Sequence, residues 1–365
     1  MKNYLYIDDE SLSSIQAIAD GLNDTNDIHV ECLDLSQCAN FEQLSDVIVE
    51  KMSINNIQGI ILDMCLNGGG ENQLSFTAAP IAQQIRTLSS IGQIGEIPVI
   101  LCSTDERIKE TYRPDRASHD LYDYKFVKEK LDYKKVATKL NVLASAYEMS
   151  FTELPIEKIL GRQDGIALLD ERIFERFYNN QYSKYDLIHY LIKEIFRHPG
   201  VVINEEILLA RLGVDESESS EESMTILRDF YNKTFRYTGI LSDGWTRYWS
   251  DKLFCFFSNQ GYNINAMSAA ERVAFFNNVL GGTNLVAAKP IIFNQSTYYD
   301  TICDKLRKPM DSLEGYAVQE TTELKPWQEH RYISFYAFAS GKIDEGILSQ
   351  NEKTRLKDTY EQHSK

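Results

Sequence analysis

The strongest constraint on the fold is the alternation of short apolar strand patterns with helical patterns over the first 150 residues. The strand patterns occupy residues 4–7, 28–35, 59–62, 97–102 and 124–127. The helical patterns occupy residues 11–22, 41–52, 78–88 and 133–147, and a glycine-rich loop at residues 68–70 precedes the third of them. Apolar strands separated by helices are typical of a parallel sheet that is covered by helices on both faces. The sequence therefore predicts a doubly wound, five-stranded parallel α/β domain at residues 1–148.

The remainder of the chain has a different pattern. With 365 residues and a mass of 41.9 kDa, the chain exceeds an average domain, which favours two domains. Beyond residue 148, short amphipathic patterns rich in aromatic residues predict mostly helices, including one at 298–307, and a strand near 331–337. We therefore expect a second, mostly α-helical (α+β) domain at residues 149–365.

The composition excludes several classes of protein. Hydrophobic residues make up 43% of the chain and charged residues 25%, which are ordinary globular values and exclude a disordered chain. The formal charge of −16 argues against a general nucleic-acid binder, because phosphate neutralisation needs a basic face. The six cysteines lack metal-site spacing, the N-terminus lacks a signal-peptide pattern, and no apolar run approaches the ~18 residues of a membrane span. These observations predict a soluble, cytoplasmic protein that does not contact a membrane.

Polar residues directly follow four of the five predicted strands. They are Asp8 and Asp9 after the first strand, Asp63 after the third, Ser103 and Thr104 after the fourth, and Lys128 after the fifth. Because the carboxyl ends of parallel strands meet at one edge of a sheet, we expect these side chains to converge. Adjacent carboxylates raise one another's pKa unless a cation lies among them. Mg²⁺, which prefers oxygen ligands, is the cation that suits such a site.

These residues, in this order, resemble the receiver domain of bacterial response regulators. The segments that carry the resemblance are YLYIDDES, GIILDMCLNGG, IPVILCSTD and DYKFVKEK. Each segment alone is a weak signal, but four in the right order, each at a predicted strand end, are much more specific. The resemblance covers about residues 1–148, some two-fifths of the chain.

The resemblance implies phosphoryl transfer to one aspartate. Asp63 would accept the phosphoryl group from a phosphohistidine of a histidine kinase or phosphotransfer protein. The implied cofactor is Mg²⁺, held by Asp8, Asp9 and Asp63 together with the backbone carbonyl of Cys65. Lys128 would pair with the phosphoryl oxygens.

The implied switch is a hydroxyl that moves inward when the aspartate is phosphorylated. Ser103 is expected in that role, and Thr104 shares it because it stands where the family usually has a small residue, so that the register can shift by one. Glu129 replaces the proline that commonly follows the lysine. The aromatic switch position of the family falls on Lys125, with Tyr124 as the nearest substitute.

Each of these residues also has a purely structural interpretation. Asp8 and Asp9 suit the N-terminus of the following helix, and Ser103 and Thr104 suit a helix cap. A receiver that keeps the fold but has lost phosphorylation is therefore an alternative, because site and fold are separable.

One segment of the second half, residues 196–208, resembles the start of a winged-helix output domain. It reads FRHPGVVINEEIL, and a diverged winged-helix element at about 184–240 would follow from it. The pattern then departs, because residues 215–222 are strongly acidic where a basic recognition helix would be needed. A helical domain that serves for packing or for binding a partner is thus expected in preference to a DNA-binding domain.

Three outputs remain open. The first is a phosphorelay protein, acting as phosphate intermediate, sink or regulator, whose second domain contacts a kinase, another receiver protein or a second copy of the chain. Its architecture is loosely similar to receiver proteins of bacterial phage-defence two-component systems. The second is a transcription regulator with a diverged winged helix, and the third is an effector enzyme switched by phosphorylation. No separate catalytic motif is found, so only the receiver's own phosphorylation and dephosphorylation chemistry is expected.

Overall fold

The computed structural model describes residues 1–363 apart from 36, 37, 39, 67–76, 107–117, 163–165, 167, 168, 180 and 321. The glycine-rich loop expected at residues 68–70 lies outside this description. The chain forms two compact units. The first comprises Met1–Ile159, Phe174–Tyr190 and Gly239–Trp245, and the second comprises Leu160–Ile173, Leu191–Thr238 and Thr246–Lys365.

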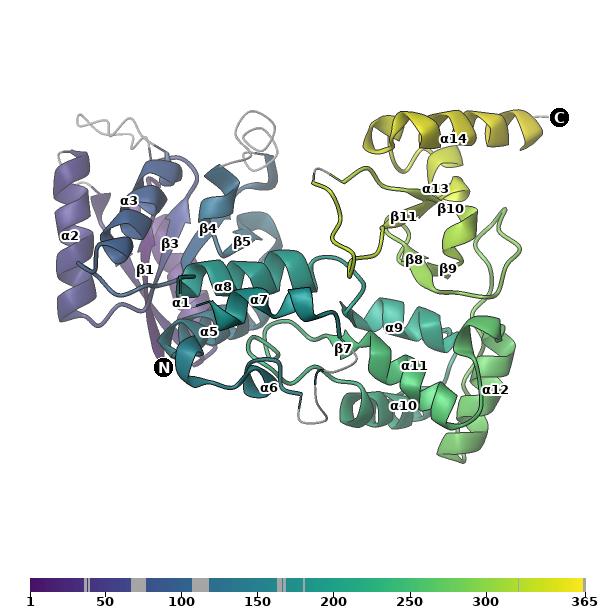
Figure 1. Cartoon of the computed structure of the whole chain (residues 1–365). Coiled ribbons are helices and arrows are strands. Elements are labelled where there is room, and N and C mark those ends of the chain that lie inside the picture. Colours follow the sequence, from purple (N-terminus) through teal and green to yellow (C-terminus); the bar gives the residue numbers. More distant parts are fainter. Residues whose placement is uncertain are drawn as a thin grey trace. The chain divides into compact units, whose positions relative to one another are not determined.

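The first unit is built on a five-stranded, all-parallel sheet (Figure 1). Its strands are β1 (Lys2–Ile7), β2 (Ile28–Leu33), β3 (Gly59–Asp63), β4 (Val99–Ser103) and β5 (Tyr124–Val127). The strand order is β2-β1-β3-β4-β5. This is the order of the flavodoxin-like doubly wound folds. The predicted α/β receiver-like fold is confirmed.

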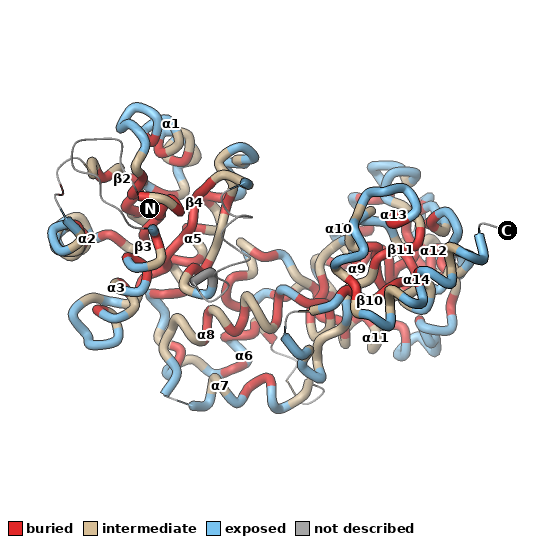
Figure 2. The backbone as a smooth tube through the Cα atoms, turned by 90° about the horizontal axis from the view of Figure 1, so that it is seen from above, coloured by how far each residue is buried: buried red, intermediate tan, exposed pale blue. Residues whose placement is uncertain are grey.

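Helices cover both faces of this sheet. They are α1 (Leu12–Asn23), α2 (Phe41–Ile54), α3 (Ala78–Ser90) and α5 (Tyr133–Glu148). Along β1, Leu5 and Ile7 belong to the core that contains buried residues of α2 and α3. Tyr4, directly before Leu5, is fully buried and donates a hydrogen bond to the carbonyl of Leu140 in α5 at 2.6 Å. The two-residue period of the strand thus sends alternate side chains to the two helical layers, and Figure 2 shows the buried strands and the exposed outer sides of the helices.

Two later segments of the chain complete the first unit. One contains α7 (Glu175–Tyr178) and α8 (Lys184–Tyr190), and the other is Gly239–Trp245; α6 (Ile156–Ile159) precedes them. At the start of α8, the Nζ of Lys184 donates to the carbonyl of Tyr147 at 2.7 Å. The first compact unit therefore contains residues beyond position 148, the boundary expected from the sequence.

Two large hydrophobic cores lie in the described part of the second unit. The first lies among α9 (Glu205–Leu212), α10 (Glu221–Thr234), α11 (Ser250–Asn259) and α12 (Ala269–Leu280). Before α9, β6 (Val202–Ile203) pairs antiparallel with β7 (Tyr248–Trp249). The diverged winged-helix element expected at about 184–240 stays a prediction.

The second core of this unit lies around a small mixed sheet and two helices. The sheet contains β8 (Thr301–Cys303), β9 (Lys308–Met310), β10 (Gly315–Ala317) and β11 (Tyr332–Ser334) in the order β10-β11-β8-β9, and the helices are α13 (Phe335–Ala339) and α14 (Gln350–His363). The helix expected at 298–307 is wrong, because this segment forms β8 and the turn of a hairpin with β9. Apolar spacing suggested a helix, whereas pairing with β9 and β11 decides the structure. The strand expected near 331–337 is present only as β11, since α13 begins at Phe335.

Among the described residues, no helix is long and apolar enough to span a membrane.

Gly59 provides a test of how tightly the sheet packs against α5. A Cβ atom at this position would lie 2.2 Å from the buried ring of Tyr4, whose hydroxyl is anchored on α5. We expect Gly59→Ala to lower the free energy of unfolding by about 1–3 kcal/mol. The added methyl group would overpack the core, and the hydrogen bond of Tyr4 to α5 restrains its ring from moving away. Urea denaturation would measure this. The matched control is Gly95→Ala, since no atom lies within 4 Å of a Cβ there; equal loss in both variants would contradict the packing argument.

Candidate functional site

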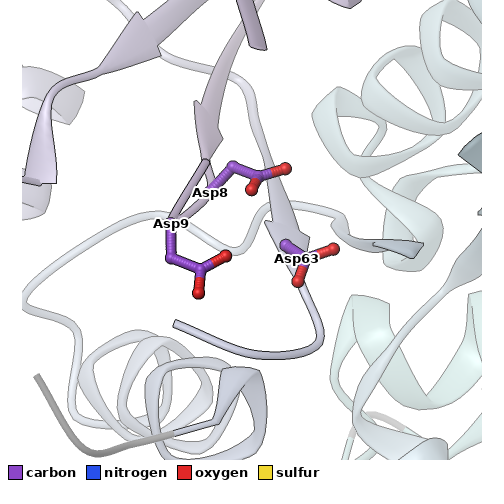
Figure 3. Close-up of side chains that lie close together, drawn as sticks. All are labelled: Asp8, Asp9 and Asp63. Atoms are coloured by element: carbon purple, nitrogen blue, oxygen red, sulfur yellow. The ribbon is translucent and has the colours of Figure 1, made fainter. Parts of the chain in front are cut away.

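Three carboxylates meet at the carboxyl ends of β1 and β3. Asp8 and Asp9 follow β1, and Asp63 is the last residue of β3. One carboxylate oxygen from each lies within 4.8 Å of the others, and Figure 3 shows the three side chains just beyond the strand ends. These residues were expected at one edge of the sheet because they follow parallel strands, and the structure places them at that edge.

Lys128, the first residue after β5, reaches into this carboxylate cluster. Its Nζ lies 2.7 Å from Oδ2 of Asp8, 3.1 Å from Oδ1 of Asp63 and 2.9 Å from Oε1 of Glu10. The replacement of the usual proline by Glu129 therefore leaves the lysine pointing at the predicted site.

The two innermost carboxylates are removed from solvent. Asp8 is 1% exposed and Asp63 is 0% exposed. Asp8 accepts a hydrogen bond from the Tyr6 hydroxyl at 2.5 Å, and Asp63 accepts one from the backbone N–H of Cys65 at 2.9 Å. These bonds satisfy part of the hydrogen-bonding capacity of the buried oxygens and fix the side-chain orientations.

The electrostatics favour an additional cation. Burial raises the pKa of Asp63, the positive charge of Lys128 lowers it, Asp8 raises it, and the net direction is upward. For Lys128, burial opposes the charged form, but the adjacent Asp63, Asp8 and Glu10 raise the pKa above its ordinary value. One ammonium thus faces four carboxylates when Asp9 is counted.

The donor set fits a hard divalent cation. The converging ligand atoms are carboxylate oxygens, which Mg²⁺ prefers, and their uncompensated negative charge is what such an ion neutralises. Asp8, Asp9 and Asp63 would hold it. The carbonyl of Cys65, two residues beyond Asp63, stays a predicted fourth ligand.

Ser103 supplies a buried hydroxyl next to this cluster. It is the last residue of β4, between β3 and β5 in the sheet, and it is 0% exposed. Its Oγ has no hydrogen-bond partner among the described residues. A buried hydroxyl left in this state has an unused donor available for a ligand. Thr104 follows directly and is half-buried.

Sequence reasoning missed Tyr6 and Glu10. Tyr6 lies two residues before Asp8, so the two-residue period of a strand places both on one face of β1, which was the available signal. Its hydroxyl also lies 3.6 Å from Sγ of Cys102, and burial raises the pKa of that thiol to about 12. Nothing in the sequence distinguished Glu10 from other surface acids, because its role depends on Lys128.

Lys125, at the position of the family's aromatic switch, lies with its Nζ 5.8 Å from the ring centroid of Tyr122. The neighbouring Tyr124 instead makes an edge-to-face contact with Trp245. The aromatic group of β5 that contacts a later segment of the first unit is thus Tyr124, the substitute named from the sequence.

Comparisons with known proteins add little. No protein-family model matches the chain, and no curated protein matches it either. Among solved structures, a sensor protein from Polaromonas sp. JS666 has a TM-score of 0.28 and 11% identity, covering 40% of this chain and 98% of its own. A structure described as a novel family of redox sensors in the streptococci, evolved from two-component response regulators, also has a TM-score of 0.28, with 10% identity, covering 56% of this chain and 96% of its own. At these TM-scores the likenesses carry no argument, and the receiver-like fold rests on strand order and connection.

The helix that would read DNA in a winged helix, α10, presents an acidic surface. Its exposed residues are Glu221, Glu222, Thr225, Asp229 and Lys233. Arg228 of the same helix is paired with Glu216 at 2.5 Å and Glu221 at 2.7 Å. This surface is unsuited to phosphate contacts.

A divalent ion should bind at the carboxylate cluster. We expect Mn²⁺, used as a spectroscopic substitute for Mg²⁺, to bind the wild-type chain and Asp9→Asn to weaken its affinity by at least about tenfold, because a charged oxygen ligand is lost. Electron paramagnetic resonance of free Mn²⁺ would measure this. The control is Asp20→Asn, an exposed carboxylate on α1. Equal affinity in wild type and Asp9→Asn would show that the cluster is not the metal site.

Proposed function

We propose that the chain is a response-regulator-like protein of a two-component phosphorelay, in which Asp63 accepts a phosphoryl group from a histidine kinase or phosphotransfer protein with Mg²⁺. The observation that supports this most strongly is the convergence of a buried Asp63 with Lys128, Asp8 and Asp9 at one sheet edge. All six cysteines are free thiols, which suits the reducing cytoplasm where such a relay would act.

The proposed reaction is an in-line displacement at phosphorus. A carboxylate oxygen of Asp63 forms a bond to the phosphorus of a phosphohistidine as the P–N bond breaks. The departing imidazole nitrogen keeps the electron pair of that bond, so the histidine is restored and Asp63 becomes an acyl phosphate. No oxidant or further co-reactant is required, and positioning with charge neutralisation supplies the catalysis.

Each nearby group has a role in this step. Bound Mg²⁺ would supply charge neutralisation at the transferring phosphoryl oxygens. Lys128 already lies 3.1 Å from Asp63 and would exchange part of its carboxylate pairing for the phosphoryl oxygens. The Ser103 hydroxyl, which has no hydrogen-bond partner in the described part of the chain, would then donate a hydrogen bond to the acyl phosphate.

Asp63 should be the one carboxylate of the chain that accepts a phosphoryl group. Incubation of the full chain with Mg²⁺ and a small phosphodonor such as phosphoramidate is expected to add one phosphoryl group, because the donor needs only an activated acceptor. Asp63→Asn should abolish the gain, and Lys128→Ala should slow it by about 10²-fold or more, as for loss of one preorganised charge contact. Intact-protein mass spectrometry measures both.

The control for this experiment is Asp46→Asn, which alters an exposed carboxylate on α2. It should gain the phosphoryl group at the wild-type rate, and a chelator should suppress the gain in both proteins. Phosphorylation that persists in Asp63→Asn would contradict the assignment. Absence of transfer from a phosphorylated kinase as well as from the small donor would favour the degenerate receiver.

Phosphorylation of Asp63 would affect the rest of the chain through a change in β5. Tyr124 contacts Trp245 edge-to-face, with ring centroids 5.9 Å apart. The Nζ of Lys139, in α5, lies 4.6 Å from the first ring centroid and 5.0 Å from the second. Trp245 ends the segment Gly239–Trp245 of the first unit, and the chain continues from it into β7. A shift of β5 on phosphorylation would therefore act on the segment that leads into the second unit.

Trp245 should report phosphorylation by its fluorescence. We expect the emission of the wild-type chain to change on phosphorylation, because the indole packs on β5, the strand that Lys128 directly follows. Trp245→Phe should be phosphorylated normally but should lose this change, although Trp249 and Trp327 remain. A change of equal size in Trp245→Phe would place the coupling elsewhere.

A further inference from the structure

The second unit contains a cavity of about 240 Å³ that is lined with arginines. It lies among the turn that precedes β6, the start of α9 and the β8–β9 hairpin. The charged residues that line it are Arg197, His198, Arg247, Asp304, Arg307 and Arg331. None of them belongs to the carboxylate site of the first unit.

Several of these guanidinium groups are held in place. Arg247 donates from Nε and Nη2 to the carbonyl of Phe196, at 3.1 and 2.9 Å. Asp304 accepts from Arg307 at 3.0 Å and from Arg331 at 3.2 Å, so one carboxylate holds two arginines. Side chains fixed in this way lose little further entropy when a ligand binds.

The cavity is electropositive within an acidic chain. Its lining carries four guanidinium groups and one carboxylate, a difference of three positive charges, while the whole chain carries −16. One positive charge remains even when Glu206 and Glu320, which pair with Arg307 and Arg331, are subtracted. Burial lowers the pKa of Arg247 to about 10. The guanidinium groups thus lack full compensation, which an anion would supply.

His198 provides a second polar group with unused capacity. It is 7% exposed, and its Nδ1 has no hydrogen-bond partner among the described residues. The nearest carboxylate oxygen, Oε1 of Glu320, lies 3.9 Å away, which is too far for a hydrogen bond. Burial lowers the pKa of His198, Glu320 raises it, Arg197 and Arg331 lower it, and the net direction is downward. A buried imidazole facing an electropositive cavity is available to a ligand.

The backbone at Arg307 is strained. This residue has a φ of 56°, in the left-handed region that favours glycine, at the turn between β8 and β9. A glycine would suit the turn better, yet the position carries a side chain that lines the cavity. Strain of this kind is concentrated at binding sites, where the side chain has a use.

Apolar side chains also line the cavity. They are Phe196, Val202, Ile203, Ile207 and Ile302. The volume lies slightly below the ~300–1,000 Å³ of ordinary ligand pockets. A small ligand with an anionic end and an organic part matches this mixed lining and the size of the cavity.

We propose that this cavity binds a phosphate-bearing small molecule, with the phosphate held by the arginines and His198 and the organic part against the apolar side chains of the lining. Guanidinium forks match phosphate oxygens in bidentate geometry, and a phosphate dianion compensates more of the surplus charge than a single carboxylate does. Free inorganic phosphate shares the recognised chemistry and is the other source that the test distinguishes.

The test is isothermal titration calorimetry on the full chain carrying Asp63→Asn, without divalent ions, so that the first unit's site does not contribute. The probes are inorganic phosphate, adenosine 5′-monophosphate, adenosine and a short random DNA duplex. We expect phosphate and the nucleotide to bind with a Kd below about 1 mM. Tighter binding of the nucleotide assigns an organic phosphate, and equal affinities assign free phosphate.

Three variants locate the binding. Arg197→Gln alters an exposed side chain without a partner among the described residues, and Arg307→Gly relieves the backbone, so both should fold. Each should weaken phosphate binding by at least about tenfold, as expected for loss of a charge-assisted hydrogen bond. The charge-matched control Arg228→Gln, on α10, should leave the affinity unchanged.

Three results would overturn the proposal. The first is that neither inorganic phosphate nor adenosine 5′-monophosphate binds. The second is that the two cavity variants bind phosphate as tightly as the Arg228→Gln control. The third is that only the DNA duplex binds and that the cavity variants lose this binding. The last result would assign the arginines to a nucleic-acid backbone.

Discussion

The ion pairs of Lys128 with the buried carboxylates are the interaction on which the first unit depends. Asp8 and Asp63 are almost fully buried, and burying an unpaired carboxylate costs several kcal/mol. One ammonium at 2.7 and 3.1 Å offsets part of that cost. The ends of β1, β3 and β5 must therefore meet at one sheet edge, and the order β2-β1-β3-β4-β5 satisfies this with β4 and its Ser103 in between. The excess of negative charge that remains makes the site suitable for a cation.

Much of this arrangement could be predicted from the sequence, because the apolar patterns of strands and of helices are both clear in the first 150 residues. Apolar strands alternating with helices define a doubly wound sheet, and residues directly after such strands share one edge. Asp8, Asp63 and Lys128 were found in this way. Glu10 was not, because its role depends on the reach of the Lys128 side chain. Tyr6 was also missed, although the two-residue period of β1 places it on the same face as Asp8. The family's aromatic switch position holds Lys125, and only the structure shows Tyr124 packed on Trp245.

The second half was less predictable for a physical reason. Strands β8 to β11 have three residues each, too few for a two-residue period to stand out. The spacing in 298–307 fits a helix, yet long-range pairing with β9 and β11 wins over local preference. The arginine cavity was also invisible in the sequence, since its arginines come from positions 197 to 331. The average charge of the chain conceals this basic cluster.

The central claim is that Asp63 becomes an acyl phosphate, and chemical trapping tests it most directly. Borohydride reduces an aspartyl phosphate to homoserine, so the phosphorylated full chain would be reduced, digested and sequenced by tandem mass spectrometry. The account predicts homoserine at position 63 and aspartate at positions 8 and 9. Homoserine at another aspartate, or phosphate found on a histidine, serine or threonine instead, would contradict it.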